Sequence, residues 1–133
     1  MSEENVDVVR ATFDAFQKRD LQAFLNCMDP EVEYRSLVLE VEGTYHGHEG
    51  IQLWWESVLA VFPDWNPQIE EAREVCSRVV SRVRAEGHGT GSGIAMERDI
   101  WHVAEVRDGR LKWSAFFRTE QEALEEAARD RPD

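Results

Sequence analysis

The residues of this sequence with the clearest capacity for chemistry lie on one predicted strand, near residues 94–106. His102 is expected to share one face of that strand with Arg98, Ile100 and Ala104, because alternate side chains of a strand point the same way. Histidine titrates near neutral pH and is suited to general acid–base catalysis. If this face lines a cavity, His102 is the best candidate base, and the cation Arg98 would lower its pKa. The alternative is a core histidine that bonds a backbone or carboxylate group.

Tyrosine and arginine side chains on other predicted strands are further candidates. Tyr34 lies on a short strand after the second predicted helix, where its hydroxyl could donate a hydrogen bond to a substrate oxygen, or the ring could simply pack. Arg82 and Arg84 alternate with Val83 and Ala85. If the arginine face lines a pocket, a buried arginine requires an acidic partner or an anionic ligand. On a solvated sheet face, the arginines would instead form cross-strand ion pairs.

Metal and nucleophile motifs are weak or missing in the sequence. His46 and His48 flank Gly47, but a His-x-His pair without a third ligand nearby does not predict a metal site. Ser92 lies in a glycine-rich stretch that does not match a strand-to-helix nucleophile elbow. No phosphate-binding loop or dinucleotide-binding fingerprint occurs. We therefore expect no metal and no cofactor.

Composition limits the class of protein and its partners. The chain has 133 residues, a length typical of a single domain that spans residues 1–133. Its net charge of −12 argues against nucleic acid and anionic membranes as partners, because both require clustered basic residues. Cys27 and Cys76 lack metal-type spacing, the N-terminus is polar and acidic, and no apolar run is long enough to span a membrane. We expect a cytoplasmic protein.

Helical periodicity is concentrated in the first half of the chain. A first helix is predicted after Ser2, and a shorter second helix, capped by Asp20, is expected to stop at Pro30. A third helix carries a broad apolar face that includes Trp54 and Trp55.

Strand periodicity dominates from residue 68 onward. Strands are predicted near 68–75, 78–88, 94–106 and 111–118. Asp108-Gly109 is a hairpin turn signal between the last two, and the capping box Thr119–Glu122 opens a short final helix. Gly47 and Gly50 are expected to shape a tight loop before the third helix. Helices followed by a meander of strands indicate an α+β domain.

Several short sequence segments, in their order along the chain, resemble the motifs of one family. They are Asp14–Leu21, Pro30–Tyr34, Gly43–Ile51, Gly87–Gly93 and Asp108–Leu124. Together they make the chain similar to the SnoaL-like polyketide cyclase group of the nuclear transport factor 2-like superfamily. The resemblance implies a cone-shaped, curved antiparallel sheet with three N-terminal helices that enclose a pocket, and a short C-terminal helix. It also implies a homodimer, in which outward-facing Trp101 or Trp113 would supply apolar area.

The resemblance also suggests roles for single residues. In ketosteroid isomerases the position of the general base matches Tyr34, and that of the oxyanion tyrosine matches Thr12. The second oxyanion acid of these isomerases matches Trp101 or His102. In SnoaL-type cyclases the catalytic aspartate, counted back from the Asp-Gly turn, matches His102. A histidine there changes the residue type but keeps a group capable of acid–base chemistry.

The limonene-epoxide hydrolases share the same superfamily and use two aspartates and an arginine. Their arginine–aspartate strand pair matches Arg82 and Arg84, which would turn the arginine face toward the pocket. Their last aspartate matches Ala115. Both carboxylates are therefore missing, which argues against epoxide opening by that mechanism.

The sequence thus predicts a protein that binds a small apolar or polycyclic ligand in the cone. Two interpretations remain open. One is cofactor-independent acid–base chemistry of the cyclase, isomerase or dehydratase type, with His102 as base and Tyr34 as hydrogen-bond donor. The other is a non-catalytic ligand-binding or interaction domain. The candidate substrate-binding residues are Arg82, Arg84, Arg98, Trp54 and Trp55. A perturbed titratable group deep in the pocket would favour the enzyme, and an apolar pocket without one would favour the binder.

Overall fold

The computed structural model describes residues 2–37, 43–89, 93 and 95–129. The helices in these residues are α1 (Ser2–Gln17), α2 (Leu21–Asn26), α3 (Gly47–Val61) and α4 (Glu120–Ala128). The strands are β1 (Met28–Ser36), β2 (Gly43–His46), β3 (Asn66–Val75), β4 (Arg78–His88), β5 (Ala95–Arg107) and β6 (Arg110–Phe117). Within the same residues, no helix is both long enough and apolar enough to cross a membrane.

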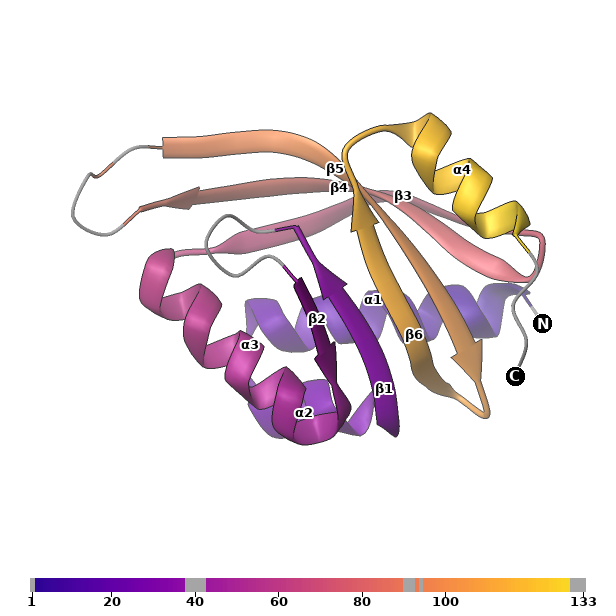
Figure 1. Ribbon diagram of the computed structural model, residues 1–133, viewed down its shortest axis with the longest axis horizontal. Coiled ribbons are helices and arrows are strands. Elements are labelled where there is room, and N and C mark those ends of the chain that lie inside the picture. The colour runs from indigo at the N-terminus through magenta and orange to yellow at the C-terminus, as the bar shows by residue number, and fades with distance from the viewer. Residues whose placement is uncertain (1, 38–42, 90–92, 94, 130–133) are drawn as a thin grey trace.

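A curved six-stranded sheet joins the strands in the order β2-β1-β6-β5-β4-β3. The first three helices lie on one side of this sheet, called here the inner face, and α4 lies on the opposite, outer face (Figure 1). The arrangement confirms the predicted α+β class and the cone-like sheet with three N-terminal helices and a short C-terminal one. One pairing differs from the prediction, because β1 runs parallel to β6. A long connection through α3 and four strands joins the two, so no hairpin turn sets their relative direction.

Side-chain caps begin two of the helices, as the sequence predicts. Asp20 accepts a hydrogen bond from the backbone N–H of Ala23 at the start of α2. Thr119 accepts one from the backbone N–H of Glu122 at the start of α4. Each bond satisfies a first-turn N–H group that has no partner inside its own helix.

Two boundaries differ from the predicted ones. α2 ends at Asn26 rather than at Pro30, because Met28 already begins β1 and pairs with Leu111 of β6. The predicted loop before α3 contains the short strand β2, which pairs with β1 at the edge of the sheet. Both differences arise from tertiary pairing, which overrides local residue preferences.

Gly47 and Gly50 have the structural role expected of them. Gly47 begins α3 with a φ of +67°, a left-handed conformation that is costly for residues with a Cβ atom. A Cβ atom at this position would also lie 3.1 Å from the carbonyl oxygen of Pro30. At Gly50 a Cβ atom would lie 3.2 Å from the backbone of Tyr45. The two glycines therefore let α3 start close against β1 and β2.

Hydrophobic clusters cover both faces of the sheet. The inner cluster connects α1 and α3 with the sheet and includes Phe16, Trp54 and Val83. The outer cluster lies between the sheet and α4 and includes Trp113 and Ala123. The alternation of side chains along each strand separates the two clusters. The inner cluster is the one that contains the candidate site.

Candidate functional site

A pocket opens between the inner face of the sheet and the N-terminal helices. Its lining residues are Thr12, Phe13, Phe16, Phe24, Tyr34, Leu37, Trp54, Trp65, Pro67, Met96, Arg98, Ile100, His102, Leu111 and Phe116. The cavity volume is about 30 Å³, and all the empty space between the lining atoms, including the part open to solvent, amounts to about 650 Å³. Ligand pockets usually reach about 300 Å³ or more. A ring-sized ligand therefore has to displace half-buried lining side chains such as Met96 and Phe116.

His102 presents its ring to the pocket from β5, with 1% of the residue exposed. The ring centroid lies 5.2 Å from that of Phe13 and 4.7 Å from that of Phe116. Nε2 shares a hydrogen bond of 2.5 Å with Oγ of Ser114 on β6. Nδ1 has no hydrogen-bond partner among the residues that the structure describes. The protein thus fixes one ring nitrogen and leaves the other without a described partner.

Burial determines the charge of His102. Its pKa falls from 6.5 to about 3, because the apolar surroundings disfavour the charged imidazolium. Desolvation, rather than the expected influence of Arg98, is the cause of this shift. His102 is therefore neutral at physiological pH, where it can form hydrogen bonds but is a weak base.

A second buried polar atom lies on the residue next to His102 in the sheet. Ser81 of β4 pairs directly with His102, and its buried Oγ has no hydrogen-bond partner within the described chain. Buried hydroxyl groups normally have one, so Nδ1 of His102 and Oγ of Ser81 mark a polar spot in the apolar core, and of the two residues His102 lines the pocket. The sequence interpretation missed both Ser81 and Ser114. Counting from the Asp108-Gly109 turn alone would place Ser114 opposite Val103, on the outer face, and the irregularity between Glu105 and Val106 is what brings it to the face of His102.

Tyr34 supplies a neutral hydroxyl group to the same pocket. The residue is 4% exposed, and its ring packs edge-on against Trp54 at 4.8 Å and Phe116 at 5.8 Å. Burial raises the pKa of Tyr34 far above its usual range, so the hydroxyl stays protonated. Thr12 also lines the pocket, but its hydroxyl donates to the carbonyl oxygen of Val8 in the same helix, at 2.8 Å.

Arg98 is the charged residue of the pocket wall. It lies on the same face of β5 as Ile100 and His102, as the alternation of the strand predicts. The side chain is half-buried. No acidic side chain in the described part of the protein forms an ion pair with it. The pocket therefore combines an apolar wall, the three neutral polar side chains of Thr12, Tyr34 and His102, and one cation.

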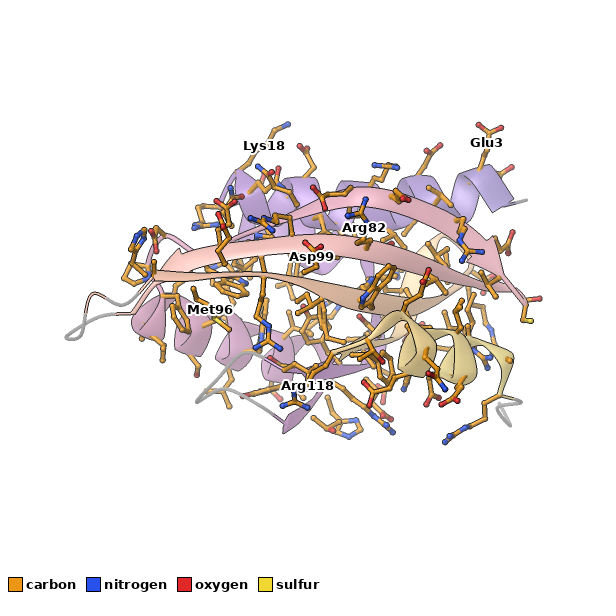
Figure 2. All side chains as sticks on the ribbon, turned by 90° about the horizontal axis from the view of Figure 1, so that it is seen from above. Glu3, Lys18, Arg82, Met96, Asp99 and Arg118 are labelled. Carbon is orange, nitrogen blue, oxygen red and sulfur yellow. The ribbon has the colours of Figure 1, made fainter. Side chains whose placement is uncertain are left out.

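Arg82 and Arg84 lie on the outer face of the sheet, which corrects the inward orientation expected from the resemblance to the hydrolases. Asp99 forms ion pairs with both, at 3.8 Å from Arg82 and 3.5 Å from Arg84. Figure 2 shows Arg82 and Asp99 beside each other on this face. The alternating residues Val83 and Ala85 are the ones that enter the inner cluster. Neither arginine contributes to the pocket wall.

The two tryptophans of α3 differ in their relation to the pocket. Both pack in the inner cluster, but Trp54 lines the pocket and Trp55 does not. Trp55 packs behind the wall, with ring centroids 4.8 Å from Phe16 and 5.1 Å from Phe24. Trp65, which the sequence interpretation did not select, lines the pocket instead.

The two outward-facing tryptophans are less accessible than expected. Trp113 is 6% exposed, because α4 covers it with Ala123 and Ala127. Trp101 is half-buried beside the same cluster. Trp113 therefore has little surface to offer a second subunit, which corrects that part of the expectation.

The His-x-His segment has a structural explanation. His48 donates from Nε2 to the carbonyl oxygen of Met28 at 3.0 Å, which ties the start of α3 to β1. His46 precedes α3 and is exposed. In the described ranges, no group of three or more His, Cys, Asp or Glu residues could hold a metal ion.

Comparison with known proteins gives both a family and a set of similar structures. The model of the SnoaL-like domain family matches residues 9–113, more than half of the chain. TerC, co-crystallised with polyporic acid, is 25% identical, with 93% of this chain and 97% of TerC covered and a TM-score of 0.77. A nuclear transport factor 2-like protein of unknown function from Burkholderia pseudomallei K96243 is 21% identical, with coverages of 95% and 98% and a TM-score of 0.78.

A third similar structure is a proposed SnoaL-like polyketide cyclase from Jannaschia sp. CCS1. It is 20% identical, with 98% of this chain and 95% of that chain covered and a TM-score of 0.73. No curated protein sequence matches the chain. The family match and the shared fold agree with the motifs described above, and the chain belongs to the SnoaL-like domain family.

Proposed function

We propose that this protein binds a small, largely apolar, multi-ring molecule in the cone pocket and contacts one of its oxygen atoms through His102. The observation that carries the proposal is Nδ1 of His102, which is buried without a described partner. A buried polar atom without a hydrogen bond costs free energy, and a ligand hydroxyl or carbonyl group would offset that cost. Oγ of Ser81, on the residue paired with His102, extends the polar spot.

The aromatic wall suits a ligand with rings. Phe13 of α1, Trp54 of α3 and Phe116 of β6 line the pocket from three sides of the fold. Aromatic rings pack favourably in offset or edge-to-face arrangements, and they bury large apolar areas. The relative TerC was crystallised with polyporic acid, which supports a role of this fold in binding small molecules.

A neutral fluorescent dye tests this proposal. N-phenyl-1-naphthylamine is apolar, contains joined rings and emits more strongly in apolar surroundings. We expect the wild-type protein to bind it, and Met96→Trp, which puts a larger side chain in the pocket wall, to weaken binding about tenfold or more. The matched control Glu97→Trp puts the same side chain on the next residue of β5, which is exposed. It should change binding by no more than about twofold. Equal binding to both variants would mean that the dye does not use the pocket, and would contradict the proposal.

Acid–base chemistry at His102 is the second candidate function. The hydrogen bond to Ser114 orients the ring, and the Tyr34 hydroxyl in the same pocket could stabilise a developing oxyanion. The low pKa of His102 weakens it as a base, so binding is the function that the site supports best. The rate at which 2-tetralone, a bicyclic ketone, exchanges its protons for deuterium in deuterated water distinguishes catalysis from non-catalytic binding. Faster exchange with wild type than with His102→Gln supports catalysis, and equal rates support non-catalytic binding.

We also propose a homodimer that pairs through the outer face of β3, β4 and β5. Acidic and basic side chains alternate there, including Arg82, Arg84 and Asp99. A surface with both charges can complement a second copy of itself across a two-fold axis. Sedimentation should give a dimer at micromolar concentration, and a monomer would contradict the assignment.

A further inference from the structure

We propose that the ligand of the cone pocket is an organic acid whose anionic group is held by Arg98. This inference rests on the proposed function and names the chemical class of the ligand. Three observations on the described residues support it: the partners of the sheet arginines, the charges of the pocket wall, and the spacing along β5.

The arginines of the sheet differ in their partners. On the outer face, Arg84 pairs with Glu97 at 2.7 Å, and Arg82 pairs with Glu70 at 3.0 Å. On the inner face, Arg98 is half-buried and forms no ion pair with a described acidic residue. A guanidinium group that is partly removed from water gains most from a carboxylate-like partner, which it can bind with two parallel hydrogen bonds. The protein supplies such partners outside the pocket and leaves Arg98 to a ligand.

The electrostatics of the pocket favour an anion beside Arg98 and nowhere else along the lining. The chain carries a net charge of −12, so general attraction of an acidic ligand to the protein surface is excluded. The lining residues include no aspartate or glutamate, and His102 and Tyr34 are both neutral. An ion pair between Arg98 and a ligand would form beside apolar walls, where screening by water is weaker than at the surface.

The spacing along β5 indicates the shape of the acid. Arg98 and His102 are four residues apart on one face, which separates their Cα atoms by about 13 Å. Ile100 lies between them and contributes an apolar surface. A matching ligand has an acidic group at one end, an oxygen at the other end for His102, and apolar rings between the two.

Two dyes with the same ring system test the inference. 8-Anilinonaphthalene-1-sulfonate carries a sulfonate group that N-phenyl-1-naphthylamine lacks. We expect wild type to bind the sulfonate dye about tenfold more tightly than the neutral dye. Arg98→Met keeps an apolar stem without the charge, so the affinities for the two dyes, each measured on the same variant, should differ by no more than about twofold. Arg98→Lys keeps the charge and should keep a preference for the sulfonate dye.

Arg84→Met is the matched control, because it removes an arginine of similar exposure from the outer face. It should leave the affinity for both dyes unchanged. If the neutral dye binds in a Met96-sensitive manner but the sulfonate preference is absent or survives Arg98→Met, the acid inference is wrong and the proposed function stands. If neither dye responds to Met96→Trp, the proposed function is wrong and the inference fails with it.

Discussion

Replacing Trp54 with alanine is expected to lower the free energy of unfolding by about 4 kcal/mol. Trp54 is 3% exposed and stands at the centre of an aromatic cluster. Its ring lies 4.8 Å from Tyr34, 5.6 Å from Phe16 and 6.0 Å from Phe24, measured between centroids. The indole N–H also donates to Oγ of Ser36 at 3.0 Å. Truncation to alanine would therefore leave a large cavity and remove a buried hydrogen bond.

Chemical denaturation of two further variants separates these contributions. Trp54→Phe keeps most of the ring contacts but loses the N–H group, so we expect it to cost about half as much as alanine. Leu53→Ala is the matched control on the same helix, because Leu53 is 58% exposed. It should change stability by no more than about 0.5 kcal/mol. A Trp54→Ala cost similar to that of Leu53→Ala would show that the cluster does not support the pocket wall.

Acidification from pH 7.5 to 4.5 is expected to remove about 2.5 kcal/mol of stability through His102 alone. The pKa of His102 is 6.5 as an unperturbed side chain and about 3 in the folded protein. Between these values the unfolded chain binds a proton that the folded chain does not, so stability is complete above pH 6.5 and declines as the pH falls. Within the pocket, burial raises the pKa of Tyr34, so its hydroxyl stays neutral over this range.

Denaturation of wild type and His102→Gln at several pH values measures this contribution. Glutamine can keep a polar group near Ser114 but does not titrate, so the variant should lack the decline that His102 causes. Surface carboxylates, including Asp64, whose hydrogen bond to His88 lowers its pKa, titrate in both proteins and cancel in the difference. Parallel pH profiles for the two proteins would show that His102 is not buried as described.

Local sequence patterns predicted the elements of this fold well. The periodicity of α1 and α3, the caps at Asp20 and Thr119, and the Asp108-Gly109 hairpin are all properties of neighbouring residues. The parallel pairing of β1 with β6 and the start of β1 at Met28 depend on contacts distant in sequence. Residue patterns do not encode such contacts, which is why those two features were missed.

The sequence predicted only part of the candidate site, because local patterns place residues along a strand but do not give contacts between residues distant in sequence. Strand alternation correctly grouped His102 with Arg98 on one face of β5. The inward orientation of Arg82 came from the resemblance to hydrolases, although the alternating apolar residue Val83 pointed to the opposite choice. The hydrogen bond between His102 and Ser114 depends on the strand register, which includes an irregularity between Glu105 and Val106. A sequence pattern gives no such register shift.

The most direct measurement for the proposed ligand site is a crystal structure with 2-naphthol, whose hydroxyl can both donate and accept a hydrogen bond. We predict that the rings lie against Phe13 and Phe116 and that the hydroxyl lies within about 3.2 Å of Nδ1 of His102. Naphthol found outside the cone, or inside it with Nδ1 of His102 still unpartnered, would contradict the proposed function.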